Sequence, residues 1–135
     1  MKKVLVAGLA VGIAAANSVS AAATIDGSAA ASDAGLKLAT TWDKTFAQSD
    51  KVEHRKVTFK NRYGITLAAD LYKPKDAKGK LPAIAVSGPF GAVKEQASGL
   101  YAQTMAERGF LTIAFDPSYT GESGGEPRNV ASPDI

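Results

Sequence analysis

The sequence contains one pattern that is typical of a nucleophilic serine. Gly121, Ser123 and Gly125 satisfy the pattern G-x-S-x-G, in which the serine sits on a sharp turn between a strand and a helix. Pro127 and Pro133 follow the motif closely and disfavour a continuous helix after it, because proline interrupts the helical hydrogen bonds. We therefore predict that Ser123 is not a catalytic nucleophile.

The residues that could assist a nucleophile are few. His54 is the only histidine and precedes every candidate serine and acid, so we interpret it as a half-exposed strand residue. Asp116 lies directly before Pro117, and we interpret it as a turn residue rather than as the acid of a catalytic triad.

Two loops are placed where an open parallel sheet binds its ligands, beyond the carboxyl ends of the strands. The first, residues 87–94, lies between a predicted strand and the N-terminus of a predicted helix, where backbone N–H groups can face a developing negative charge. The second, residues 116–127, is rich in glycine and small polar residues. The sequence thus predicts a site built largely from backbone donors.

The elements that must position these loops follow from hydrophobic periodicity. Alternating residues predict a β-hairpin over residues 52–60 and 65–72, with turn residues at 61–64 between the strands. Short apolar runs predict buried strands over residues 81–86 and 110–115, covered on both faces, with a helix over residues 95–108 between them. Gly109 suits the left-handed end of that helix. The predicted fold class is therefore α/β, with an antiparallel hairpin followed by a parallel strand-helix-strand unit.

The N-terminal third has a different character. Lys2 and Lys3, the apolar run of residues 4–16 and the small residues after it predict a signal peptide over residues 1–22. Residues 23–50 are predicted to form a flexible tether and a short helix over residues 41–48, and residues 51–135 a truncated domain. Trp42 either lines a pocket or anchors this short helix on the sheet. We expect a periplasmic or secreted protein without a stable membrane anchor, because the apolar run is too short to span a bilayer.

Composition narrows the function classes further. Of the 16 basic residues, two belong to the leader, which leaves 14 against 13 acidic residues and a net charge of +1. No basic run with interleaved aromatic residues remains, so we expect no nucleic-acid partner. The chain has no cysteine, and its stability must come from packing without disulfides. The sequence leaves the oligomeric state open.

Two segments carry a resemblance to a known family. SGPFGAVKEQ (residues 87–96) and FDPSYTGESGGEPR (residues 115–128), in this order and with a helix and a strand between them, resemble the α/β-hydrolase superfamily in its dienelactone-hydrolase-like branch. The resemblance covers about residues 52–135 and implies the N-terminal part of an α/β-hydrolase sheet. Many relatives begin the first loop with a histidine, whereas this chain has Ser87 and Gly88.

The resemblance implies a serine hydrolase that cleaves ester, lactone or amide bonds of small molecules through an acyl-enzyme, and the predicted signal peptide makes it an exported one. It implies one oxyanion donor in the first loop, which we assign to the backbone of Phe90, with Gly91 giving close approach, since Pro89 has no N–H. Alternatively, Pro89, Phe90 and Gly91 form an ordinary turn with Phe90 packed on the helix.

Some features stay outside this assignment. Tyr119 is a possible pocket-lining residue or a cap on the sheet edge, and we expect neither a cofactor nor a metal. Nucleophile, acid and histidine are absent in the order that the family uses. The alternative function is a non-catalytic binding or interaction module on the same scaffold.

Overall fold

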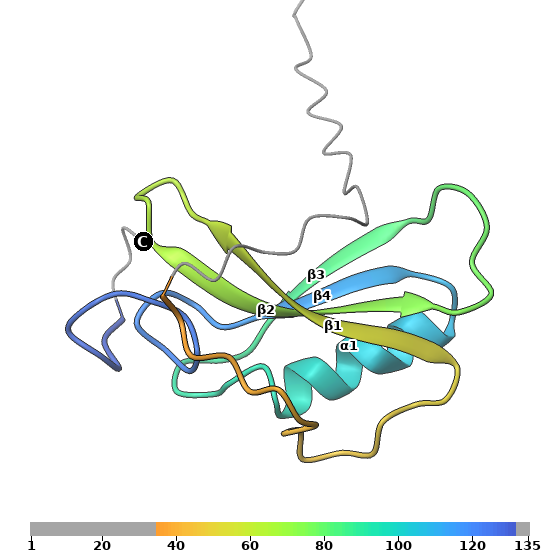
Figure 1. The fold of residues 1–135 in the computed structure, drawn as a ribbon, viewed down its shortest axis with the longest axis horizontal. Coiled ribbons are helices and arrows are strands. Elements are labelled where there is room, and N and C mark those ends of the chain that lie inside the picture. The colour runs from red at the N-terminus through yellow and green to blue at the C-terminus, as the bar shows by residue number, and fades with distance from the viewer. Residues whose placement is uncertain (1–34, 132–135) are drawn as a thin grey trace, which may run out of the picture.

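The computed structural model describes residues 35–131, which form a four-stranded sheet with one helix on one face (Figure 1). The elements along the chain are β1 (Val52–Lys60), β2 (Thr66–Pro74), β3 (Ala83–Ser87), α1 (Ala97–Glu107) and β4 (Leu111–Phe115). In the sheet the order is β1-β2-β4-β3; β1 and β4 are antiparallel to β2, and β3 is parallel to β4. This confirms the predicted hairpin followed by a parallel strand-helix-strand unit.

The hairpin turn is organised by one side chain. Asn61 Oδ1 accepts hydrogen bonds from the backbone N–H groups of Tyr63 at 2.9 Å and Ile65 at 3.0 Å. Gly64 has a φ of +77°, a conformation that glycine adopts at little cost. The turn fixes the register of β1 against β2, in which Lys60 stands opposite Thr66.

The core lies between the sheet and α1. Strand alternation directs Val52, Tyr72 and Ala114 to the helix, where they meet Ala102 and Ala106. The helix approaches closely because its buried side consists of small residues apart from Gln103, and the Thr112 hydroxyl donates to the Ala102 carbonyl oxygen at 2.8 Å. The core therefore holds the parallel pair rigidly against α1.

Two glycines explain where α1 can lie and where it ends. A Cβ on Gly99 would overlap the carbonyl oxygen of Lys94, so this helical position excludes larger residues. Gly109 has a φ of +98°, and its N–H donates to the Ala106 carbonyl oxygen at 3.0 Å. The predicted left-handed end of the helix at Gly109 is confirmed.

The helix predicted over residues 41–48 is wrong, because this segment has no helical backbone. Its polar groups instead bond to distant parts of the fold. The Thr45 N–H donates to the Glu95 carbonyl oxygen at 3.0 Å, and Gln103 of α1 bonds the Ala47 carbonyl oxygen and the Ser49 N–H. These tertiary bonds outweigh the local preference for a helix. The predicted leader and most of the predicted tether, residues 1–34, lie outside the described residues.

Strand β3 differs from the prediction of a strand covered on both faces. Within residues 35–131 it pairs only with β4, and Ala83, Ala85 and Ser87 are exposed on the face opposite α1. An apolar strand with one unpaired edge is a template for further pairing. None of the helical structure within residues 35–131 has the length and hydropathy that a bilayer crossing requires.

Candidate active site

The candidate active site lies at the carboxyl edge of β3 and β4. In the register of this parallel pair Ser87 stands beside Phe115, so the two strands end at the same level. The β3–α1 loop (residues 88–96) therefore leaves the sheet next to the β4 loop (residues 116–130). Open parallel sheets bind ligands at such an edge.

The β3–α1 loop contains a tight turn with Phe90 and Gly91 at its centre. The Ala92 N–H donates to the Pro89 carbonyl oxygen at 3.0 Å, and Gly91 has the positive φ, +81°, that a type II turn requires. Phe90 is 71% exposed, so its ring does not pack on α1 as the alternative interpretation expected. Among the described residues the N–H groups of Phe90 and Gly91 have no hydrogen-bond partner, which leaves two neighbouring donors for a ligand.

The two loops meet in an ionic cluster. Its members are Asp43, Lys56, Lys94, Glu95, Asp116 and Glu122. The side chains of Lys94 and Asp116 are fully buried, and Lys94 Nζ lies 2.8 Å from Asp116 Oδ2 and 2.7 Å from Glu122 Oε2. The sequence analysis missed this cluster, although Lys94 and Asp116 lie in the two loops that it singled out.

The carboxylate of Asp116 does more than complete a turn, which corrects its interpretation as a turn residue. Its Oδ1 accepts from the backbone N–H of Lys94 at 2.8 Å, and its Oδ2 accepts from the N–H of Glu122 at 3.0 Å. With the Lys94 ammonium, three protein donors therefore surround it. Asp116 ties the β3–α1 loop to the β4 loop.

Lys94 and Glu122 of this cluster are both charged near neutral pH. Burial alone would lower the pKa of Lys94, but its hydrogen bonds to Asp116, Glu122 and Glu95 outweigh burial and raise that pKa. Burial would raise the pKa of Glu122, yet hydrogen bonds from Lys56 and Lys94 lower it. Each buried charge thus has partners of opposite sign, the condition under which charges are tolerated inside a protein.

Three carboxylates of the cluster, those of Asp43, Glu95 and Glu122, each place an oxygen within 4.8 Å of the others. Lys56 forms ion pairs with all three. Its ammonium supplies the positive charge that a metal cation would otherwise bring. The proximity of the three carboxylates is therefore explained by ion pairs with Lys56.

Ser123 is buried, and both functions of its hydroxyl are used. It donates to the Asp116 carbonyl oxygen at 2.7 Å and accepts from the Ala68 N–H at 2.8 Å. No helix follows it in the described residues. The structure therefore supports a structural role for Ser123, which agrees with the prediction that it is not a nucleophile.

His54 lies in β1, and it is more enclosed than the expected half-exposed residue. Its side chain is 14% exposed, and Nε2 lies 2.7 Å from Oδ1 of the fully buried Asp70. The Lys44 ammonium is 3.1 Å from the other oxygen of Asp70. A buried aspartate in the middle of β2 requires such partners, and this explains why His54 points inward.

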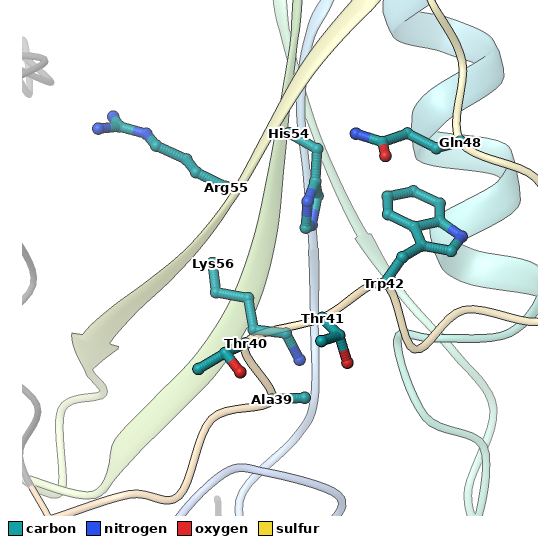
Figure 2. Close-up of a pocket in the computed structure, with 8 residues that line it drawn as sticks. All are labelled: Ala39, Thr40, Thr41, Trp42, Gln48, His54, Arg55 and Lys56. Carbon is teal, nitrogen blue, oxygen red and sulfur yellow. The ribbon is translucent and has the colours of Figure 1, made fainter.

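A pocket of about 300 Å³ opens between the N-terminal segment and β1 (Figure 2). Trp42 and His54 line it together, with their rings edge to face at 5.1 Å, while Arg55 points away from both. Trp42 also packs against the core, and its Nε1–H donates to the Phe46 carbonyl oxygen at 2.7 Å. Both interpretations of Trp42 thus hold in part, since it lines a pocket and anchors its segment on the sheet, but without the predicted helix.

Tyr119 belongs to the β4 loop and is held there by its backbone. It has a φ of +70°, its N–H donates to the Gly124 carbonyl oxygen at 2.8 Å, and its carbonyl oxygen accepts from the Asn129 N–H at 2.8 Å. Its ring lies so close to Gly125 that a Cβ there would overlap it. The assignments of Phe90, Gly91 and Tyr119 to a substrate site stay predictions.

Comparison with known proteins gives a family match. Residues 63–134 match the model of the X-Pro dipeptidyl-peptidase (S15) family, and this stretch is more than half of the chain. It begins in the hairpin turn and includes both loops of the candidate active site.

Relatives extend the match to most of the chain. The uncharacterized protein PA2218 of Pseudomonas aeruginosa is 72% identical over 117 residues, which cover 86% of this chain and 32% of that protein. Its crystal structure matches with a TM-score of 0.72 and 79% identity, over 74% of this chain and 32% of that chain. The α/β hydrolase GrgF from a Penicillium species matches with a TM-score of 0.50 and 32% identity, over 57% of this chain and 26% of that chain.

The uncharacterized protein YcjY of Escherichia coli is 49% identical over 86 residues, which cover 61% of this chain and 28% of that protein. The chain therefore spans about a third of the length of the curated relatives it matches. Its four strands and helix match the N-terminal part of an α/β-hydrolase fold.

Proposed function

The chain belongs to the X-Pro dipeptidyl-peptidase (S15) family, and from this we propose that it is part of a serine hydrolase that cleaves ester, lactone or amide bonds through an acyl-enzyme. The observation that carries the proposal is the pair of unpartnered N–H groups of Phe90 and Gly91 at the carboxyl edge of β3. When a nucleophile attacks an acyl carbon, the carbonyl oxygen becomes negatively charged, and preorganised N–H donors stabilise it.

The remaining parts of the mechanism are proposed to lie in the two thirds of the relatives' length that this chain does not span. His54 is bonded to Asp70, and Ser123 is bonded at its hydroxyl, so neither is free to act at the β3–α1 loop. The unpaired edge of β3 is the place where we propose that the parallel sheet continues. A triad in the order serine, acid, histidine would then follow in the chain.

The branch of the superfamily and the substrate are finer proposals. The two loop segments favour a dienelactone-hydrolase-like enzyme acting on a small ester or lactone. The family name instead points to peptides with proline in second position. Turnover of p-nitrophenyl acetate by the complete protein would support the first, and turnover of a dipeptidyl Xaa-Pro p-nitroanilide the second.

We expect the complete protein to hydrolyse at least one of these two substrates above background. The folded Ser123→Ala variant should keep measurable activity, because loss of a structural hydroxyl lowers the rate whereas loss of a nucleophile abolishes it. Release of p-nitrophenol or p-nitroaniline, followed by absorbance, measures both. If the folded protein turns over neither substrate, the alternative of a non-catalytic binding module on the same scaffold gains support instead.

We also propose that the protein is exported to the periplasm or secreted, without a stable membrane anchor. The proposal rests on Lys2, Lys3 and the apolar run of residues 4–16, followed by small residues. The intact mass of protein recovered from the periplasm or medium should correspond to a new N-terminus near residue 23. A protein that stays in the cytosol with Met1 at its N-terminus would contradict export.

A further inference from the structure

We propose that Asp116 is a positioning residue that holds the β3–α1 loop in the conformation presenting the Phe90 and Gly91 N–H groups to the substrate. This inference rests on the proposed hydrolase function. It assigns to the acidic residue after β4 a role that is neither that of a triad acid nor that of a turn residue.

Asp116 holds Lys94 at two points. One carboxylate oxygen accepts from the Lys94 backbone N–H at 2.8 Å, and the other lies 2.8 Å from Lys94 Nζ. The backbone bond fixes the path of the loop only four residues after Phe90. Because both side chains are fully buried, water does not compete for these bonds.

Asp116 is itself fixed to the centre of the sheet. Its N–H donates to the Ala68 carbonyl oxygen at 3.0 Å, and its own carbonyl oxygen accepts from Ser123 Oγ at 2.7 Å. The β4 loop wraps the carboxylate so closely that a Cβ on Gly121 would overlap it. The β3–α1 loop is thus clamped to a rigid part of the fold.

An amide cannot replace the carboxylate of Asp116. Asparagine has one accepting oxygen in place of two, and its NH2 group donates. In one orientation the NH2 group would face the Lys94 backbone N–H, and in the other it would face Lys94 Nζ and the Glu122 N–H, so a donor would meet a donor in both. Lys94 would still keep Glu95 and Glu122 as counterions, so its charge stays compensated. Asp116→Asn should therefore loosen the clamp and leave the rest of the cluster paired.

The test compares Asp116→Asn with Asp43→Asn in the complete protein, using whichever p-nitrophenyl ester or p-nitroanilide the wild type turns over. Asp43 belongs to the same ionic cluster and undergoes the same chemical change, but in the described part of the chain its carboxylate bonds only to Lys44 and Lys56. For Asp116→Asn we expect kcat to fall roughly 10- to 100-fold with KM within about threefold, since misplaced donors weaken the transition state more than substrate binding. For Asp43→Asn we expect kcat within about twofold of the wild type.

The affinity of a trifluoromethyl ketone inhibitor is a second measurement, because its tetrahedral adduct is stabilised by the oxyanion donors. Its affinity should fall in Asp116→Asn by the same factor as kcat/KM. Unchanged kcat, or a loss confined to KM with unchanged inhibitor affinity, would overturn the inference. If Asp116→Asn does not fold, Gly121→Ala replaces it, because it pushes on the carboxylate without changing any charge. Gly64→Ala is its control, with a similar positive φ and no atom near the added Cβ.

Amide hydrogen exchange tests the clamp on the β3–α1 loop independently of the proposed hydrolase function. If the wild type turns over nothing, the proposed function fails, but the clamp still predicts faster exchange of residues 88–96 in Asp116→Asn than in the wild type or Asp43→Asn. Equal exchange of this loop in all three proteins would overturn the clamp whatever the activity.

Discussion

Replacing Phe90 by proline in the complete protein is expected to lower kcat by about 10²- to 10³-fold, the usual effect of removing one oxyanion donor. Proline removes the N–H of this position together with the exposed phenyl ring, and a leucine variant controls for loss of the ring. Phe90 is the second residue of a type II turn, a position where proline is common. The turn itself should therefore survive the substitution.

Phe90→Leu is the matched control. It keeps the N–H and exchanges one exposed apolar side chain for another, so its kcat should stay close to that of the wild type. Both variants must show wild-type circular dichroism and melting curves before their rates are compared. Equal activity of the two folded variants would move the donor away from Phe90, with the Gly91 N–H as the next candidate.

Replacing Lys94 by methionine is expected to lower the free energy of unfolding by about 3–5 kcal/mol, because it leaves the buried carboxylate of Asp116 without its counterion, whereas Glu95 and Glu122 keep Lys56. Asp116 has no exposed surface and would lose the only ion-pair partner that it has within residues 35–131. Lys56→Met should cost less, since Asp43 keeps Lys44 and Glu122 keeps Lys94. Urea denaturation of the complete protein, at equal slope for all variants, measures the difference.

A double variant gives the internal check on this explanation. Lys94→Met combined with Asp116→Asn removes the uncompensated charge, so it should be more stable than Lys94→Met alone. A Lys94→Met protein as stable as the wild type would show that the buried pair contributes nothing to folding.

Local sequence patterns were sufficient to predict the sheet and α1. Alternation marked β1 and β2, apolar runs marked β3 and β4, and Gly109 marked the end of the helix. The helix over residues 41–48 was wrong because the segment's polar groups bond to Glu95, Gln103 and Asp70, which are distant in sequence. Periodicity in a short window carries no information about such partners.

The ionic cluster was missed for the same reason. Lys94 and Asp116 are 22 residues apart, and only the register that places Ser87 beside Phe115 brings their loops together. One signal was present in the sequence: Asp70 lies inside an apolar strand and needed a partner, which could have led to His54 and Lys44. The sequence indicated a turn at Pro89, Phe90 and Gly91. Which of its N–H groups lack a partner among the described residues depends on backbone geometry, which the sequence pattern does not give.

The most direct test of the central claim, a serine hydrolase whose nucleophile is not Ser123, is labelling of the complete protein with a fluorophosphonate. This reagent phosphonylates an activated serine, and intact mass with peptide mapping locates the adduct. We predict a single adduct on a serine other than those of residues 1–135, with Ser123 unmodified because its hydroxyl is buried and bonded. An adduct on Ser123, or no adduct on the folded protein, would contradict it.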